Sequence, residues 1–153
     1  MARAYGAAWN ATNTQSTTVP IMTLTSTSAV RPLLYDIING SDATPADNAA
    51  TFLMRRHTTA PASGTAITPA PLDSQDPAAV CTAMMGPSIG APTLTASTSV
   101  LQWMQNQRAT FRWVAAPGRE IKLPATANAG VSLLPSVVGG SAVNFGGCWE
   151  FDE

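Results

Sequence analysis

The sequence is poor in charge. Only 11% of its 153 residues are charged, and the formal net charge at pH 7 is -1. An ordinary soluble domain carries about 25% charged residues, so uncharged Ser, Thr, Asn and Gln supply much of the polarity here. The eight basic residues are scattered except for the pair Arg55 and Arg56. Because binding to a phosphate backbone needs a basic stripe or patch, we expect no nucleic-acid partner.

Long apolar runs are also missing. The sequence contains no uninterrupted apolar stretch of roughly 18 residues, the length at which a membrane-spanning helix becomes a candidate. The first ten residues hold one arginine and no apolar run of signal-peptide length. We therefore expect neither an export signal nor a membrane span, and no membrane partner.

Histidine and cysteine, which build many metal and nucleophile sites, are scarce. The chain has one histidine, His57, and two cysteines, Cys81 and Cys148, which match no metal or redox spacing. We interpret both cysteines as buried free thiols and His57 as a strand histidine, either exposed or packed. No nucleophile motif surrounds any Ser or Cys. The sequence thus predicts no metal, no cofactor and no catalytic residue.

Two further kinds of site lack a supporting pattern. Asp73, Asp76 and the acids of the 42–47 loop offer oxygen ligands to a hard cation, but their spacing is not that of an EF-hand. Turns and helix capping explain these residues. The glycine pair at 139–140 lacks the Lys-Ser or Lys-Thr of a phosphate loop. We expect a protein that is not an enzyme; an enzyme of unrecognised type would be revealed by turnover that depends on His57.

Proline and glycine punctuate the chain throughout. Twelve prolines and eleven glycines leave intervals that are too short for a series of stable helices. Within these intervals, apolar and β-branched residues favour short strands. One interval ends at Asn39-Gly40-Ser41-Asp42, which is a strong turn signal. We expect about eight strands, at 16–25, 30–38, 49–58, 93–104, 108–115, 120–123, 130–134 and 141–152.

The stretch 60–92 departs from this pattern because it is rich in Pro and Ala. Only 65–68 and 80–85 can be regular within it, so we expect one long Pro-rich loop. Asp76 as N-cap and Pro77 at the first helical position favour one short helix there. The chain length fits a single domain, 1–153. We predict an all-β, antiparallel β-sandwich or jelly roll, in which residues 1–29 form an N-terminal arm and the first strands, with engagement of a neighbouring subunit as an option.

Several segments resemble, in their order and wording, one family of small β-sandwich proteins. That family is encoded in the structural regions of tailed bacteriophages and is interpreted as capsid decoration proteins or other virion components. The resemblance covers roughly residues 30–153, and its strongest part is 106–120. The segments that carry it are 40–41, 45–49, 64–66, 68–73, 76–79, 106–120 and a closing Phe151-x-Glu153.

The resemblance implies a decoration, or cement, protein on the outer surface of a phage capsid. Its partner would be the major capsid protein, its location the virion after assembly in the host cytoplasm, and its state a homo-oligomer, with a trimer favoured. It supplies no active-site residues. Interfaces are enriched in arginine and aromatic residues. Candidate interface residues are therefore Arg55, Arg56, Arg112 and Trp113, for each of which an ordinary core or solvated role is at least as good an explanation.

An adhesion module on a tail or surface, binding a glycan or a protein receptor, is the alternative. The sequence has four tryptophans, which can stack on sugars or anchor a partner. Their positions within expected strands favour core or subunit contacts over a sugar platform. The four residues are Trp9, Trp103, Trp113 and Trp149.

Overall fold

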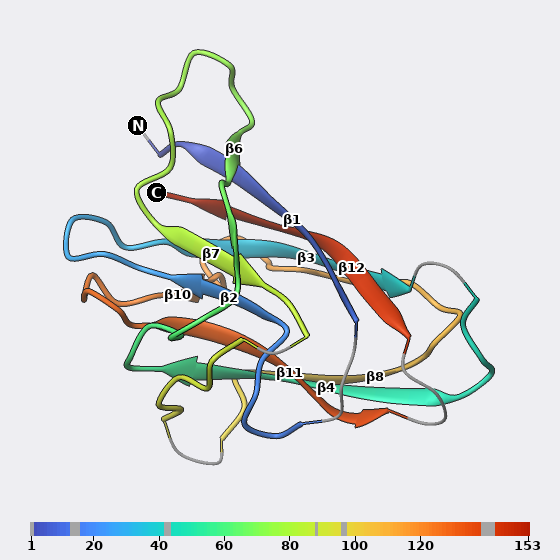
Figure 1. The fold of residues 1–153 in the computed structure, drawn as a ribbon. Coiled ribbons are helices and arrows are strands. Elements are labelled where there is room, and N and C mark those ends of the chain that lie inside the picture. Colours follow the sequence, from blue (N-terminus) through green and yellow to red (C-terminus); the bar gives the residue numbers. More distant parts are fainter. Residues whose placement is uncertain (1, 13–15, 42–43, 88, 96–97, 139–142) are drawn as a thin grey trace.

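The computed structural model describes residues 2–12, 16–41, 44–87, 89–95, 98–138 and 143–153. These residues form two antiparallel sheets that pack face to face, and they include no helix (Figure 1). The N- and C-terminal segments lie side by side near one end of the molecule (Figure 1). The fold class expected from the sequence, an all-β antiparallel sandwich, is confirmed.

Sheet A contains six described strands. In this sheet β6, β1, β12 and β3 lie in that order, and both β9 and β10 pair with the other edge of β3. Their bounds are β1 (Ala4–Thr12), β3 (Leu33–Ser41), β6 (Ala70–Pro71), β9 (Phe111–Val114), β10 (Ile121–Lys122) and β12 (Asn144–Asp152).

Sheet B also contains six described strands, in the order β5, β7, β2, β11, β4 and β8. A register irregularity between Pro135 and Val137 interrupts the pairing of β11 with β4. This suits a strand proline, because proline cannot donate to the hydrogen-bond ladder. The bounds are β2 (Met22–Thr25), β4 (Ala49–His57), β5 (Thr65–Ile67), β7 (Thr82–Met85), β8 (Leu101–Asn106) and β11 (Gly130–Val138).

Eight of the described strands form four nested pairs. β4 pairs with β8, β3 with β9, β2 with β11, and β1 with β12. Strands β1 to β4 alternate between sheets A and B, so the nested pairs are rolled up instead of lying flat. Pairing of β11 with β4, and of β12 with β3, closes the roll. The connections consequently gather at the two ends of the sandwich (Figure 1).

A row of aromatic side chains joins the two sheets inside the core. Phe111 stacks on Trp103 with ring centroids 4.5 Å apart, and Trp103 stacks on Phe52 at 5.3 Å. Phe52 then meets the edge of Phe145 at 5.0 Å. Phe111 and Phe145 belong to sheet A, whereas Trp103 and Phe52 belong to sheet B. The row therefore ties the sheets together through large apolar areas in favourable ring geometries.

Each expected strand range overlaps a strand, but the number of strands was underestimated. The described residues form twelve strands. Strand β1 was not among the expected ranges, because Ala and Gly give a weak strand signal. Its inward positions are Tyr5, Ala7, Trp9 and Ala11. Within the 60–92 stretch, β5 and β7 fall in the two ranges expected to be regular, 65–68 and 80–85, whereas β6 was not expected; the stretch is therefore not one continuous loop. Positions 96–97 and 141–142 of the expected ranges lie outside the described residues.

The turn expected at Asn39-Gly40-Ser41-Asp42 was wrong for its first three residues. They continue β3 and pair with β12. The Asn39 amide is buried and donates to Gln105 Oε1 at 3.1 Å, while Ser41 donates to the Gln107 carbonyl. These distant partners satisfy polar side chains that locally favour a turn. Asp42 lies outside the described residues.

The short helix expected at Asp76 and Pro77 was also wrong. In a helix the Pro77 carbonyl would accept the Cys81 N–H, but it accepts the Tyr5 hydroxyl at 3.1 Å. The Cys81 N–H donates to Glu153 Oε1 at 2.6 Å. Partners on the two terminal segments therefore take the groups that a helix would use, and the chain here makes only a turn, with Asp76 N–H donating to the Asp73 carbonyl at 3.0 Å.

Candidate binding surfaces

The outer face of sheet B is covered by the protein's own chain. Met22 and Leu24 point into the core, so the alternating Thr23 and Thr25 point outward. Both threonines are nevertheless buried. The connections after β4 and β7 meet over this side, where Gly90 N–H donates to the Ser63 carbonyl at 3.0 Å. This face is therefore largely closed to a partner.

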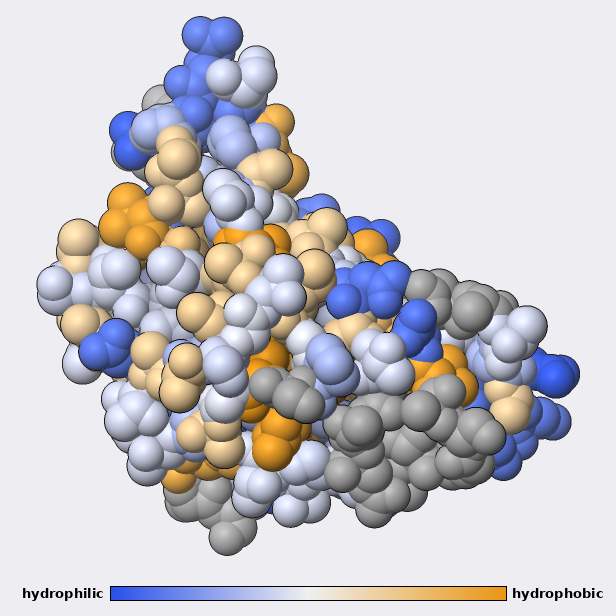
Figure 2. Space-filling view, viewed as in Figure 1, coloured by the Kyte–Doolittle hydropathy of each residue, from blue (hydrophilic) through white to orange (hydrophobic). Residues whose placement is uncertain are grey.

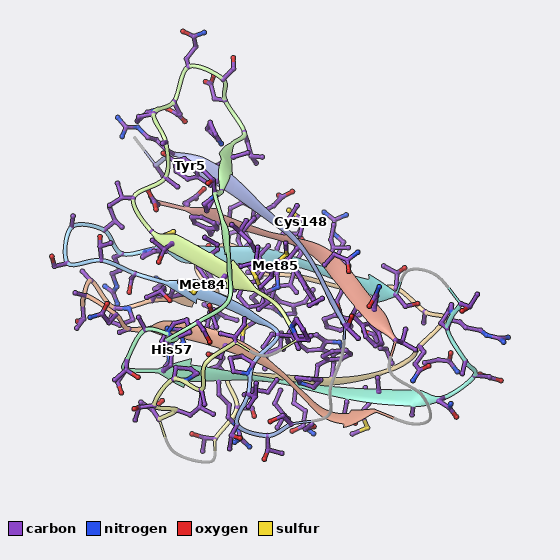
Figure 3. All side chains as sticks on the ribbon, in the orientation of Figure 1. Tyr5, His57, Met84, Met85 and Cys148 are labelled. Carbon is purple, nitrogen blue, oxygen red and sulfur yellow. The ribbon has the colours of Figure 1, made fainter. Side chains whose placement is uncertain are left out.

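His57 is buried at the covered end of this face (Figure 3). Its Nδ1 lies 2.9 Å from Ser132 Oγ and its Nε2 lies 3.2 Å from Thr25 Oγ1. Both ring nitrogens thus have hydroxyl partners from neighbouring strands. Desolvation by burial lowers the pKa of His57 from 6.5 to about 4. Of the two roles expected for His57, exposed or packed, the structure shows the packed one. The buried imidazole is uncharged at neutral pH.

The outer face of sheet A is open and carries small side chains. Ala8 and Asn10 are exposed on β1, and the neighbouring Cys148 on β12 is half-buried (Figure 3). Gly146 continues this surface beside Asn10, and Gly40 follows on β3. Asn10, Gly40 and Gly146 also line a hollow of about 360 Å³ on this face. The short side chains around it leave room for another protein to approach the sheet closely.

One ion pair interrupts this open face. Arg112 on β9 contacts Asp36 on β3 through Nη2 at 2.5 Å and through Nε at 3.1 Å. The Asp36 side chain is 4% exposed, whereas the Arg112 side chain is 60% exposed. Hydrogen bonding to Asp36, followed by its charge, raises the pKa of Arg112. Arg112 therefore covers and neutralises a carboxylate that the fold has removed from water.

Replacing Arg112 tests whether its ion pair with Asp36 stabilises the folded protein. Arg112→Ala is expected to lower the melting temperature, because Asp36 would remain desolvated without its charged partner. Arg119→Ala is the control, since Arg119 is an exposed turn residue. Differential scanning calorimetry of both variants makes the comparison. Equal melting temperatures for the two would contradict a stabilising role for the pair.

The four candidate interface residues do not form one surface. Arg112 lies on the outer face of sheet A, but the next residue, Trp113, is partly buried and packs against the core. Arg55 alternates to the outer side of sheet B. Arg56 is on the other side of β4 and donates from Nη1 to the Lys122 carbonyl at 2.9 Å. Their role in an interface stays a prediction, and no single partner face includes them all.

Three of the four tryptophans belong to the core. Trp9, Trp103 and Trp149 are at most 6% exposed. This agrees with the core role that the sequence favoured over a sugar platform. Trp113 is the partly exposed one.

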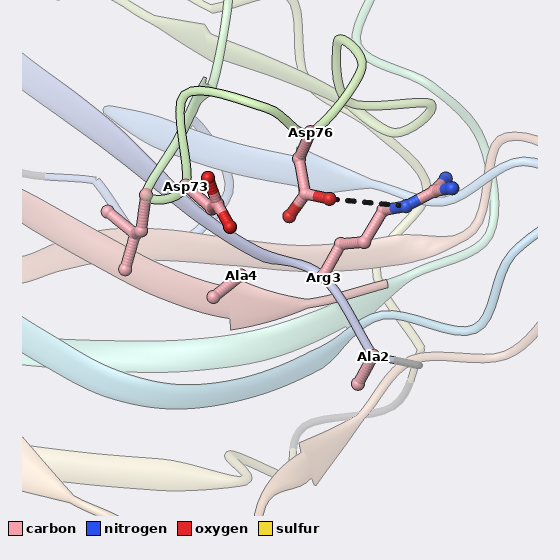
Figure 4. Close-up of a pocket in the computed structure, with 6 residues that line it drawn as sticks. Ala2, Arg3, Ala4, Asp73 and Asp76 are labelled. Atoms are coloured by element: carbon pink, nitrogen blue, oxygen red, sulfur yellow. Dashed lines mark ion pairs between the residues drawn. The ribbon is translucent and has the colours of Figure 1, made fainter.

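The connection between β6 and β7 projects beyond the sandwich beside both termini, and hydrophilic residues lie at its tip (Figures 1 and 2). Arg3 Nε pairs with Asp76 Oδ1 at 3.5 Å across a pocket at its base (Figure 4). The Glu153 carboxylate accepts the Val80 N–H at 2.9 Å as well as that of Cys81. These contacts tie the projection to the terminal segments and give Asp76 a structural partner.

The two cysteines are free, as expected, but only Cys81 is buried; Cys148 is half-buried. Desolvation is the main cause that raises the pKa of both thiols, and Glu153 adds to the effect at Cys81. Because each unit of pKa lowers the thiolate fraction about tenfold, both should be sluggish nucleophiles.

Thiol labelling should therefore separate the two residues. At pH 8 a maleimide is expected to modify Cys148 slowly and Cys81 only after unfolding. Mass spectrometry of digested samples over time measures both rates, and Cys148→Ser and Cys81→Ser variants assign them. Faster labelling of Cys81 in the native protein would contradict the burial described above.

The described part of the chain contains no group of three or more His, Cys, Asp or Glu that could hold a metal ion. It also has no helix of the length and apolarity needed to cross a membrane. Comparisons with protein-family models, with curated proteins and with solved structures found no match.

Proposed function

We propose that this protein is a structural component of a bacteriophage virion that binds the outside of the capsid and stabilises it. The observation that carries the proposal is the asymmetry of the sandwich. One sheet face is covered by the protein's own chain, with Thr23 and Ser132 buried, whereas the other exposes Ala8 and Asn10. An open face of short side chains suits a protein that binds to the surface of a capsid.

The order of the strands supports the same proposal. Four nested strand pairs alternate between the two sheets, and this order supports the jelly roll as the finer form of the sandwich in our proposal. Jelly rolls occur in viral capsid proteins and also in lectins. A fold alone does not define a function. The resemblance of residues 106–120 to phage decoration proteins is what favours the capsid over an adhesion role.

The proposed mechanism is the burial of surface between neighbouring shell subunits. A standard interface buries about 800 Å² on each partner, and apolar area removed from water contributes about 25 cal/mol per Å² before the costs of association. Repetition of this contact by the shell's symmetry would oppose expansion and rupture. A homotrimer would contact three shell subunits at once and gain from multivalency.

Binding to purified shells tests the function. The protein is mixed with shells, the shells are sedimented, and bound copies are counted by quantitative mass spectrometry against the major capsid protein. A saturable, near-integer ratio with hundreds of copies per particle is expected. A handful of copies would favour the tail adhesion module, and absence from the pellet would refute the virion proposal.

Two matched variants test whether the outer face of sheet A contacts the shell. Ala8→Arg places a long charged side chain on the open face of sheet A, whereas Ala116→Arg places it on an exposed turn after β9. Both positions are exposed, so both variants should fold. Only Ala8→Arg is expected to lose shell binding. Equal binding by the two variants would show that sheet A does not contact the shell.

A further inference from the structure

Three basic residues meet around a pocket of about 260 Å³ at one end of the sandwich. Arg31 comes from the connection between β2 and β3, Arg56 from the end of β4, and Lys122 from the end of β10. The connection and the two strand ends lie at the left end in Figure 1. Three of the eight basic residues in the sequence are thus gathered at one place by the fold.

The positive charge of this pocket has no carboxylate among the described residues that line it. The ion pairs found in the described part of the chain, Arg3 with Asp76 and Arg112 with Asp36, lie elsewhere. Glu120 lies outside the lining; its pKa is lowered mainly by the hydrogen bond from the Gly118 N–H at 2.8 Å, and Lys122 is the smallest of the causes. Like charges held together favour an anion between them.

The pocket is also organised before any ligand binds. Arg56 Nη1 donates to the Lys122 carbonyl at 2.9 Å, which fixes its guanidinium relative to β10. The Arg56 carbonyl in turn accepts the Thr95 N–H at 2.9 Å. Pro124 and Ala129 add apolar surface. A concave site with apolar walls and a few positioned polar groups is typical of ligand binding.

We propose that this pocket binds a carboxylate carried by an acidic peptide segment of the shell protein. Arginine presents a planar fork that matches a carboxylate, and the pocket volume suits one side chain with its apolar stem. Nucleic acid would need a row of basic residues, and here there is one local group. The identity of the partner rests on the proposed function, whereas the affinity for a carboxylate does not.

The pocket also has its own reporter. Thr95 lines the pocket, and its N–H donates to the carbonyl of Arg56, another residue of the lining, at 2.9 Å. A carboxylate bound to Arg56 would change the surroundings of this hydrogen bond. The Thr95 amide resonance therefore responds to occupancy in NMR spectra, independently of any shell.

The first experiment titrates the purified protein with acetyl-Ala-Glu-Ala-amide, with its glutamine counterpart and with inorganic phosphate. The glutamate peptide is expected to shift the Thr58 and Thr95 amide resonances to saturation, and the glutamine peptide to leave them unchanged. Equal effects of the two peptides, or tighter binding of phosphate than of the glutamate peptide, would overturn the proposal.

A matched set of variants locates the binding. Arg31 and Lys122 are exposed, so Arg31→Ala/Lys122→Ala should fold. Losing two favourable charge contacts should lower the affinity for the glutamate peptide about tenfold. Arg119→Ala, an exposed arginine outside the pocket lining, should bind like the wild type. Unchanged affinity in the double variant would assign the binding to another site.

The second experiment repeats shell sedimentation with the same double variant. A several-fold loss of shell binding, with Arg119→Ala unaffected, would support the pocket as a shell contact. Wild-type binding by the double variant would overturn that contact while leaving the virion function intact. If the wild type itself fails to bind shells, the proposed function fails, and the peptide titration still decides whether the pocket takes a carboxylate.

Discussion

Gly147→Ala is expected to reduce the free energy of unfolding by more than about 3 kcal/mol and to lower the soluble yield sharply. An added Cβ would lie 1.8 Å from the Ile38 carbonyl oxygen. Gly147 is in β12 and is paired directly with β3 on one side and β1 on the other. The obstructing atom is backbone in a neighbouring strand, so it cannot move away without breaking the pairing at the centre of sheet A.

Gly6→Ala is the matched control in the same sheet. There an added Cβ would lie 3.4 Å from Cys148 Sγ and 3.6 Å from a Leu72 methyl group. Those are side-chain neighbours at tolerable distances, and alanine suits an extended strand better than glycine does. Urea unfolding followed by tryptophan fluorescence compares both variants with the wild type. Similar unfolding midpoints for Gly6→Ala and Gly147→Ala would contradict the close approach of β12 to β3 at Gly147.

Much of the fold could be predicted because strand formation here follows local patterns. β4 alternates Phe52 and Met54 with Leu53 and Arg55, and a half-buried strand requires this period of two. Strand β1 was not predicted because Ala7 and Ala11 occupy inward positions, where a larger apolar residue would have indicated a strand. The turn signal at Asn39 was overridden by Gln105, a partner 66 residues away. Local sequence propensity carries no information about partners so distant in the chain.

The candidate binding surfaces were less predictable than the strands, because they depend on which distant residues the fold brings together. Arg112 and Asp36 are 76 residues apart and give no joint signal in the sequence. Arg31, Arg56 and Lys122 come from one connection and from two strands of different sheets, β4 and β10. Within the sequence only the neighbouring Arg55 and Arg56 stood out, and the strand alternation sends these two to opposite sides of β4.

Acid is expected to destabilise the protein through His57. The pKa of this histidine is about 4 in the native protein and about 6.5 in an unfolded chain. Between those values the unfolded state binds a proton that the native state does not, so lowering the pH favours unfolding. The contribution is absent above pH 6.5 and grows as the pH falls, reaching a loss of about 3 kcal/mol near pH 4.

His57→Gln isolates this contribution, because a neutral amide keeps a polar group between Thr25 and Ser132 but cannot titrate. The variant should be less stable than the wild type at pH 7.5, since the imidazole packing is lost. Carboxylates titrate alike in both proteins, so the difference between them reports the histidine. Urea unfolding at a series of pH values from 7.5 to 4.5 should show the wild type losing its advantage as the pH falls. Parallel pH profiles would mean that His57 titrates near its ordinary pKa and is not held neutral by its burial beneath Thr25 and Ser132.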